Sequence, residues 1–408
     1  MKKQNNLSVR WAILIAGVFT MLFAGVLYAW SIFKVPLLSE LKFDGFALDL
    51  NFTLTISFFC IGGLLSSKLV KIIGTRLTIV VSGLLAGLGF VLSSFLAENT
   101  VWLMYVTYAF MGGLGIGMAY ITIISTVNSW FPDRKGFSSG ALMMGFGAST
   151  LILGNLASSL FAMENIGWRK TYILVGAALG LIILLSSLII KRPGEDVVLP
   201  APKKKSGKFA ENFEPRDFKP TEMIRTFTFW RAFICLICIT AVGNTVISFA
   251  KQLVESVGAQ AALATTLVGV FAICNGLGRI ITGALFDALG RRITMICANL
   301  LTIIAAAMTL IAVSISSLPL CIIGLCLTGV SYGTSPTVAS AFTAAFYGQK
   351  NFAANLGVMN FNLMAASFIA TACSSAASAS GGYTVPFIIL LALASFALVL
   401  NFSIKRPE

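Results

Sequence analysis

The sequence predicts an all-α membrane protein with twelve transmembrane helices, arranged as two six-helix halves. Three observations support this prediction: an apolar composition, twelve long apolar runs, and a pair of loops that recur at nearly one spacing. Of the 408 residues, 57% are hydrophobic and 11% are charged, whereas soluble domains carry about 25% charged residues. So few polar side chains cannot cover a water-exposed surface, and we expect lipid to surround much of the chain.

Each apolar run is long enough to cross a bilayer as a helix, since about 20 residues span a ~30 Å hydrocarbon core. The runs do not alternate polar and apolar residues, which favours helices over a closed barrel. The first run is too long for the apolar part of a cleaved signal peptide. The predicted spans lie near residues 11–38, 48–71, 76–96, 101–131, 137–161, 170–191, 229–256, 262–286, 292–315, 318–345, 351–379 and 384–404.

A polar stretch, residues 192–226, separates the sixth predicted span from the seventh. It contains five of the eleven prolines and the basic run Lys203, Lys204 and Lys205. Such a composition buries too little apolar surface to order itself well. We therefore predict a first half of residues 1–191, a cytoplasmic linker of residues 192–226 and a second half of residues 227–408.

Lysine and arginine positions predict the orientation, because cytoplasmic loops carry an excess of these residues. With the amino terminus inside, the external side holds only Lys34, Lys42, Arg169, Lys170 and Lys251. The internal side holds the linker cluster and Lys2, Lys3, Arg10, Lys68, Lys71, Arg76, Arg134, Lys135, Arg291, Arg292, Lys350, Lys405 and Arg406. We therefore expect a multi-pass protein of the cytoplasmic (inner) membrane with both termini in the cytoplasm. Because the basic loops flank the bilayer, attraction to anionic lipid explains the net charge of +14 more simply than binding to nucleic acid does.

Two loops of the first half recur in the second. Gly74-Thr75-Arg76 follows the second span and Gly290-Arg291-Arg292 follows the eighth, and positions 74 and 290 differ by 216. The loop from Phe131 joins spans four and five, the loop from Phe346 joins spans ten and eleven, and these positions differ by 215. This agreement indicates a parallel duplication of six helices, with a substrate site at the interface of the halves.

The residue types that most enzymes use are missing from the predicted membrane core. No histidine occurs, and the carboxylates lie in loops, the linker, the termini or span ends, so hydrolytic or metal chemistry has little to work with. The eight cysteines, including the pair Cys235 and Cys238, lie in apolar runs, where small packing residues are expected rather than reactive thiolates. We expect no enzymatic activity, no cofactor and no metal site.

Arg279 is the exception among the cations, because it is predicted to lie deep within a span. It precedes Asp287 by eight residues, about 12 Å at ~1.5 Å per residue, near the middle of a ~30 Å core. A buried arginine there usually faces a cavity or a partner, and no acidic residue lies at that depth. A bound anion can supply the missing charge, and the planar guanidinium suits a carboxylate. The alternative is an arginine tied to backbone carbonyls or to water.

Other polar and aromatic residues are predicted to complete the cavity. Asn275 lies one helical turn before Arg279 on the same face and can bind the guanidinium or the anion. Tyrosines at matching depths in spans one, four and ten can donate to a carboxylate, although packing is the alternative for each alone. The predicted substrate-binding residues are Arg279, Asn275, Tyr28, Tyr120, Tyr332, Phe146 and Asn360.

The loop after span eight, Gly283-Ala284-Leu285-Phe286-Asp287-Ala288-Leu289-Gly290-Arg291-Arg292, resembles the G-x-L-x-D-x-x-G-R-R signature of the major facilitator superfamily, which implies that fold. Asp287 can accept from basic groups, and Gly290 permits the turn. We expect this loop to stabilise one gate, with simple solvation as the alternative. In the first copy of the loop, Lys71 and Ser67 replace the aspartate and the first glycine. The predicted gating residues are Asp287, Gly283, Gly290, Arg291, Arg292 and Arg76.

Three segments resemble the oxalate/formate antiporter family within the superfamily, and the resemblance covers essentially the whole chain. They are Asn128-Ser129-Trp130-Phe131-Pro132-Asp133-Arg134-Lys135-Gly136, similar to N-x-W-F-P-D-K-R-G; Asn275-Gly276-Leu277-Gly278-Arg279, similar to N-G-x-x-R; and Val26-Leu27-Tyr28-Ala29-Trp30, similar to V-Q-Y-S-W. The span-eight arginine also resembles that of the monocarboxylate transporters. The resemblance implies transport of a small carboxylate.

Two departures from these families refine the expected substrate. The oxalate carrier has a lysine in span eleven where this chain has Leu363, and one cation neutralises one carboxylate, which favours a monoanion over oxalate. Animal monocarboxylate transporters have an aspartate, linked to proton coupling, where this chain has Asn275. Any proton must therefore travel otherwise, with Lys34, with Asp49 or on the substrate. Lys34 is expected to attract anions to the external mouth or to lie at the membrane interface.

These observations predict a secondary carrier for a small monocarboxylate such as lactate, pyruvate, formate or acetate, working as a monomer by alternating access. Symport with a proton fits this prediction. The alternative within the same class is an anion exchanger of the oxalate/formate type. The alternative from another class is a carrier-like membrane sensor, against which the short linker and short tails weigh.

Overall fold

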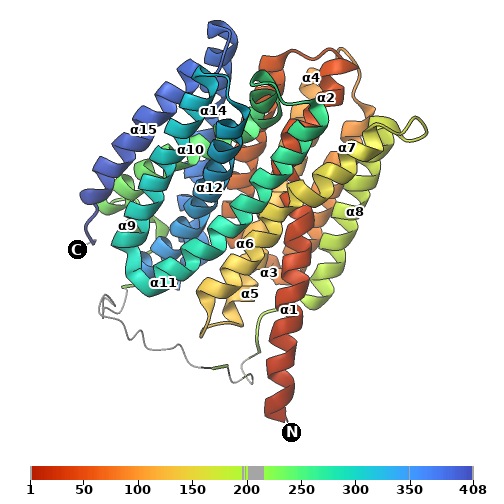
Figure 1. The fold of residues 1–408 in the computed structure, drawn as a ribbon. Helices are drawn as coiled ribbons and strands as arrows, with labels where there is room; N and C mark the ends of the chain where they lie inside the picture. The colour runs from red at the N-terminus through yellow and green to blue at the C-terminus, as the bar shows by residue number, and fades with distance from the viewer. Residues whose placement is uncertain (1, 195–196, 198, 201–215, 349, 407–408) are drawn as a thin grey trace.

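The structure is a computed structural model that describes residues 2–194, 197, 199–200, 216–348 and 350–406, without the side chains of residues 2–7, 135–136 and 287. The described residues form helices and connecting turns, and no strand occurs among them (Figure 1). The predicted all-α class is thereby confirmed.

Eight α-helices and four short 3-10 or π-helical segments form the first six membrane crossings. The 3-10 turn η1 interrupts the first crossing at Tyr28, and π-helical segments interrupt the fourth and fifth. The elements are α1 (Lys2–Ala24), η1 (Gly25–Ala29), α2 (Trp30–Ser39), α3 (Gly45–Leu92), η2 (Ser93–Phe95), α4 (Val101–Met104), η3 (Tyr105–Gly113), α5 (Leu114–Ser129), α6 (Lys135–Ser149), η4 (Thr150–Gly154), α7 (Asn155–Phe161) and α8 (Gly167–Ile189).

The last six crossings follow a short helix, α9 (Pro220–Met223). They are formed by α10 (Phe227–Ser256), α11 (Ala261–Ser314), α12 (Leu318–Tyr347), α13 (Phe352–Met359), α14 (Phe361–Ser380) and α15 (Thr384–Phe402). In Figure 1, α1 begins and α8 and α15 end toward the same side of the molecule.

Two glycine turns convert the two longest helices into pairs of crossings. Among the described residues, eleven helices are long and apolar enough to cross a membrane, and one of them, Gly45–Phe95, has 51 residues. At about 1.5 Å per residue, a straight helix of that length far exceeds the ~30 Å core. Gly74 breaks it with φ 80° and ψ 168°, and Gly290 breaks α11 with φ 75° and ψ 179°. The two positions of the sequence repeat therefore share one backbone conformation, which favours glycine.

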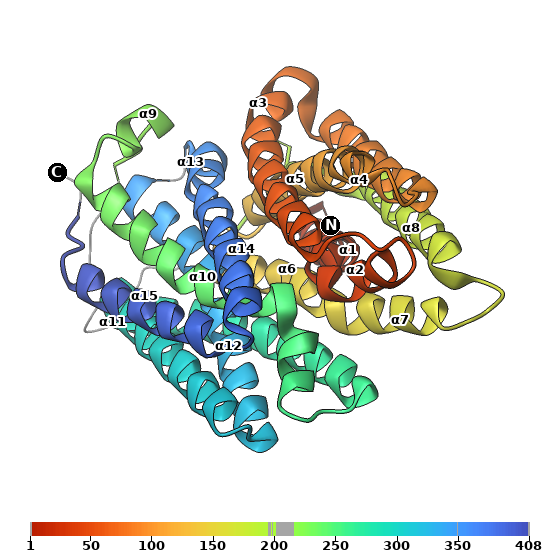
Figure 2. The same cartoon turned by 90° about the horizontal axis from the view of Figure 1, so that it is seen from above.

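The helices before and after the connection at residues 190–226 form two adjacent bundles (Figure 2). The bundles meet where α6 packs on α11 and where α3 packs on α13 and α14. Residues without side-chain bulk permit this approach: Gly147 of α6 lies against Gly276 of α11, and Gly357 of α13 lies against Leu64 of α3. Predicted site residues of both bundles lie along this boundary.

Local hydrogen bonds explain the motif between spans four and five. The amide of Asn128 donates to Ser139 Oγ at 2.7 Å, and its oxygen accepts from Ser138 Oγ at 2.7 Å, so Asn128 holds the start of α6. Arg10 of α1 forms a 2.9 Å ion pair with Asp133.

The end of the predicted linker is more ordered than its composition suggested. Phe218 is buried, its ring centroid lies 5.3 Å from that of Tyr347, and its carbonyl accepts from Asn351 and Asn355. Met223, in the short helix that follows, is also buried, and the average composition of the stretch does not reveal such individual contacts. Lys203, Lys204 and Lys205 lie outside the described residues.

Candidate functional site

Arg279 lies in α11 at the boundary of the two bundles, with 1% of its surface exposed. Its Nε donates to Asn275 Oδ1 at 3.1 Å, one turn earlier on the same helix. Its Nη1 donates to the carbonyl of Met143 in α6, across the boundary, at 2.8 Å. Nη2 is buried without a hydrogen-bond partner. Among the described side chains, no carboxylate forms an ion pair with Arg279.

These contacts leave the guanidinium incompletely satisfied. A bond to a backbone carbonyl does occur, as in the alternative considered from the sequence, but it engages only one of three nitrogens. An ionised group buried without a counter-charge costs several kcal/mol or more. Nη2 therefore offers a buried donor for an anion that enters between the bundles.

Glycines bring α11 and α12 together beside Arg279. A Cβ on Gly333 would collide with the carbonyl of Asn275 and lie 3.0 Å from the backbone nitrogen of Arg279, and one on Gly278 would collide with the carbonyl of Val330. The close approach of the two backbones holds Arg279 against the neighbouring tyrosines.

Two of the three predicted tyrosines meet across the boundary. The Tyr332 hydroxyl of α12 donates to Asn244 Oδ1 of α10 at 2.9 Å and lies 3.0 Å from the Tyr28 hydroxyl of η1. The ring of Tyr28 has its centroid 6.0 Å from Cζ of Arg279. Tyr28, Tyr332 and Arg279 thus form one cluster to which both bundles contribute.

Phe146 and Tyr120 form a second layer of this cluster. The ring of Phe146 lies 5.2 Å from that of Tyr28 and 5.2 Å from that of Tyr120, centroid to centroid, in edge-to-face geometry. Tyr120 is thereby one ring removed from Tyr28 and packs on Phe59 at 5.1 Å. Both residues line the first bundle's side of the boundary.

Asn360 of the second bundle contacts the first bundle through its backbone. It lies at the junction of α13 and α14, where its carbonyl accepts from the Cys60 thiol of α3 at 3.0 Å. This hydrogen bond joins span eleven to span two, and the asparagine that accepts from the Tyr332 hydroxyl is Asn244. Sequence reasoning missed Asn244, although an asparagine in the middle of an apolar span is itself a signal. Leu363 is adjacent, since its carbonyl accepts from the Asn244 amide at 3.2 Å.

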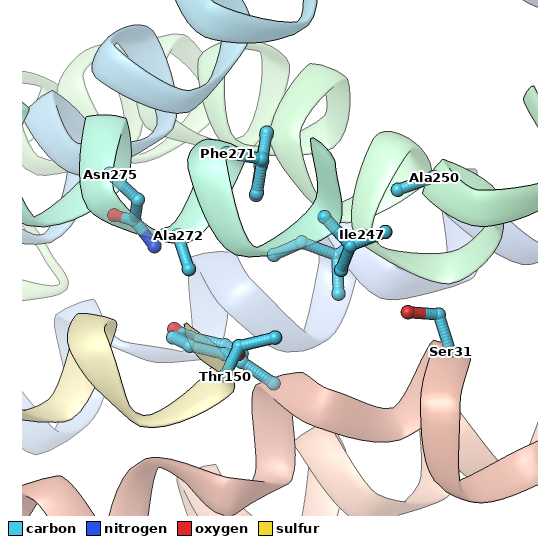
Figure 3. A pocket seen from close by; sticks show the side chains of 9 residues that line it. Ser31, Thr150, Ile247, Ala250, Phe271, Ala272 and Asn275 are labelled. Atoms are coloured by element: carbon cyan, nitrogen blue, oxygen red, sulfur yellow. The ribbon is translucent and has the colours of Figure 1, made fainter. Parts of the chain in front are cut away.

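A small cavity of about 10 Å³ adjoins the cluster (Figure 3). This is room for roughly one water molecule, so the bundles are closed around the site in this conformation. Ser31 of α2, whose buried hydroxyl has no partner, points into the cavity from one bundle, and Asn275 faces it from the other. The lining residues are Tyr28, Ser31, Thr150, Ile247, Ala250, Val268, Phe271, Ala272 and Asn275.

Lys34 departs from both expectations for it, an exposed anion attractant and an interface lysine. It is 8% exposed, forms a 3.1 Å ion pair with Asp49 of α3, and donates to the Ser248 carbonyl of α10 at 2.8 Å. Asp49 also accepts from Ser374 Oγ of α14 at 2.5 Å. These four residues, the Lys34 cluster, join α2 and α3 of the first bundle to α10 and α14 of the second. Figure 1 shows α2 at the end opposite the termini. Lys34 is neutralised within the chain, so it does not attract anions in this conformation.

The predicted gating residues lie at the end near the termini. Gly283 is buried, while Arg76 and Arg292 are exposed. Arg291 donates from Nη2 to the Ile404 carbonyl at 3.2 Å, with Cζ 5.3 Å from the ring centroid of Phe346. The side chain of Asp287 lies outside the described residues. Both Ile404 and Phe346 belong to the second bundle.

Comparisons with known proteins agree with this architecture. The profile of the Major Facilitator Superfamily matches residues 13–253 and 232–408. The Uncharacterized MFS-type transporter YhjX of Escherichia coli (strain K12) is 26% identical over 364 residues, which cover 88% of this chain and 86% of that protein. The Oxalate:formate antiporter of Oxalobacter formigenes is 25% identical over 347 residues, covering 84% and 80%.

One further match covers only part of the chain, and another covers nearly all of it at low identity. Monocarboxylate transporter 2 of Homo sapiens is 29% identical over 160 residues, 39% of this chain and 32% of that protein. A solved structure of the proton:xylose symporter XylE matches with a TM-score of 0.76 at 12% identity, covering 98% of this chain and 97% of that one. At this identity the likeness shows the fold alone.

Proposed function

The chain belongs to the Major Facilitator Superfamily, and from this premise we propose that it is a secondary carrier for a small monocarboxylate, such as lactate, pyruvate, formate or acetate. One observation carries the proposal. Arg279 is a buried cation at the boundary of the bundles, and its Nη2 has neither a hydrogen-bond partner nor a described carboxylate beside it. A carboxylate supplies both the missing charge and the missing acceptor.

The charge of the cluster favours a monoanion. Among the side chains that the structure describes, Arg279 is the one cation recorded over the Tyr28 ring, and the position adjoining Asn244 is the apolar Leu363. A dianion would keep one uncompensated charge in a low-dielectric site, which costs several kcal/mol. A monocarboxylate leaves the site neutral when bound.

Neutralisation of Arg279 by the substrate links substrate binding to the movement of the two halves. We propose that the two halves, residues 1–191 and 227–408, rock about the boundary, with residues 192–226 as their cytoplasmic linker and both termini in the cytoplasm. The substrate replaces the Met143 carbonyl at Nη1, receives a hydrogen bond from Tyr28, and stacks against Phe146. The bound substrate neutralises the charge of Arg279 and so stabilises the closed boundary, and the loop from Gly283 to Arg292 stabilises one end.

Two modes of coupling fit this site, symport with a proton and exchange of one carboxylate for another. Exchange is the second candidate, because the chain is similar over 84% of its length to an antiporter. Counterflow in proteoliposomes distinguishes the modes: labelled substrate that enters against an internal carboxylate, without a proton gradient, identifies exchange.

Substitution of Arg279 tests the proposal. Arg279→Ala removes the charge, and Arg279→Lys keeps it but loses the planar fork. Loss of one partner of a buried charge pair costs about 2–5 kcal/mol, so carboxylate affinity should fall roughly 30-fold to several thousand-fold. Uptake into liposomes should reach background in both variants, while elution in detergent stays that of a folded protein.

A matched variant controls for the general effect of changing an arginine. Arg225 is exposed, in the turn before α10, and Arg225→Lys should transport like the parent. Normal uptake by folded Arg279→Ala would contradict the proposed role.

A further inference from the structure

A second cavity, of about 110 Å³, lies between the bundles near the end that holds the termini. Its walls come from α3, α5, the segment after α8 and the start of α13, and Figure 2 shows α13 facing α3 and α5. The polar and charged lining includes Lys71, Arg192, Lys350, Thr122, Ser66, Ser67 and Ser125. No carboxylate lines the cavity among the side chains that the structure describes.

Three cations from separate segments of the chain line this cavity: Lys71 in α3, Arg192 after α8 and Lys350 just before α13. Lys71, Arg192 and Lys350 are exposed at its mouth, and none of them forms an ion pair with a described residue. The nearby Asp217 accepts from the backbone N–H of Lys350 at 2.9 Å. Like charges that share one site repel one another and are stabilised by an opposite charge among them.

The floor of the cavity offers an unused hydroxyl. Ser66, Ser67 and Ser125 donate to the carbonyls of Gly63, Leu64 and Thr122 at 2.8, 2.7 and 3.2 Å. Thr122 is 1% exposed, and its Oγ1 has no partner. A buried hydroxyl without a partner is costly, and an oxyanion seated below the three cations would accept from it.

The sequence repeat explains why this cavity has no negative charge from its own loop copy. Lys71 precedes its counterpart in the second loop copy, Asp287, by the same 216 residues that separate Gly74 from Gly290. One copy therefore has an acid where the other has a base, and the basic copy faces Lys350 of the other bundle.

We propose that this cavity binds a small oxyanion, a carboxylate or a phosphate, between the cations Lys71, Arg192 and Lys350 and the hydroxyl of Thr122. Lys71 and Thr122 belong to the first bundle and Lys350 to the second. The anion therefore bridges the bundles and holds this end closed. The ligand is either a free anion or the phosphate of an acidic lipid headgroup, and its binding is independent of Arg279.

Thermal unfolding in nanodiscs tests the site. In neutral phosphatidylcholine discs, inorganic phosphate should raise the unfolding temperature above that in chloride of equal ionic strength. Loss of one charge-assisted contact in Lys71→Gln or Lys350→Gln should raise the phosphate midpoint by about tenfold or more. Thr122→Val should raise it by a smaller factor.

Controls separate this site from the Arg279 cluster and from general charge effects. Lys170→Gln removes an exposed lysine of α8 and should respond like the parent, as should Arg279→Ala. A second arm omits phosphate and adds phosphatidylglycerol. Stabilisation by that lipid, lost in Lys71→Gln, identifies a headgroup as the occupant. Absence of stabilisation in both arms, or equal stabilisation of the parent and Lys71→Gln, overturns the proposal.

Discussion

Lys34 and Arg279 are both buried cations at the boundary of the bundles, and both donate to a backbone carbonyl of the opposite bundle, Ser248 or Met143. They differ in their counter-charge. Lys34 has Asp49 at 3.1 Å, which Ser374 supports in turn. Arg279 has the neutral Asn275 in the corresponding role, and its Nη2 has no partner.

This difference assigns separate tasks to the two cations. A charge pair that the chain completes by itself can hold an end of the molecule closed without a ligand. A cation without its own carboxylate gains its counter-charge only when an anion enters. On this account the Lys34 cluster acts as a gate and the Arg279 cluster as the substrate site.

The largest predicted effect comes from making Lys34 resemble Arg279. Asp49→Asn leaves Lys34 buried without a counter-charge, and breaking a buried ion pair costs about 3–5 kcal/mol. The end opposite the termini should open, which hydrogen exchange measured by mass spectrometry would detect as faster exchange in α2 and α14.

The double variant Lys34→Met with Asp49→Leu is the matched control. It removes both charges together and replaces them with apolar groups, so exchange should return toward that of the parent. Unchanged exchange in Asp49→Asn would show that the pair does not close this end.

The next effect comes from making Arg279 resemble Lys34. Asn275→Asp places a carboxylate where the Oδ1 contact to Nε already exists. At neutral pH this carboxylate is ionised and competes with the substrate. Affinity should fall about tenfold to a hundredfold or more, since an adjacent opposite charge is worth about one to three pKa units.

The pH dependence of Asn275→Asp supplies its own check. As the pH falls through the pKa of the new carboxyl group, that group is protonated and releases Arg279. On acidification, substrate affinity should rise more in Asn275→Asp than in the parent. A pH-independent loss would indicate a steric effect instead.

The smallest predicted effect concerns the tyrosine pair. Tyr332→Phe removes the hydroxyl between Asn244 and Tyr28 and should weaken substrate binding only several-fold, since a hydrogen bond contributes about 0.5–1.5 kcal/mol. Tyr172→Phe removes a comparable buried bond, to the Phe33 carbonyl at 2.9 Å, within the first bundle. It should leave substrate affinity unchanged. Equal affinity losses in the two variants would contradict a specific role for Tyr332.

Hydropathy and turn residues were sufficient to predict the fold. The crossings follow from apolar run lengths, and Gly74 and Gly290 mark matching turns because both need a backbone conformation with positive φ. Arg279 could be singled out because burial of a cation in lipid is rare enough to be informative from sequence alone.

Contacts between distant segments could not be predicted in the same way. The pairing of Lys34 with Asp49, and its bond to Ser248, depends on how α2, α3 and α10 pack. Periodicity places these residues on faces but does not say which faces meet. The same limitation explains why Asn244 was missed.

Thermal stabilisation by carboxylates tests the central claim, that one unpaired arginine binds one negative charge. The measurement is best made in the Lys71→Gln background, so that the cavity beside Thr122 does not contribute. At equal ionic strength, formate, acetate, lactate or pyruvate should raise the unfolding temperature, whereas oxalate should not. Addition of Arg279→Ala should abolish the rise, and addition of Arg225→Lys should preserve it. Equal stabilisation by oxalate, or stabilisation that persists with Arg279→Ala, would contradict the account.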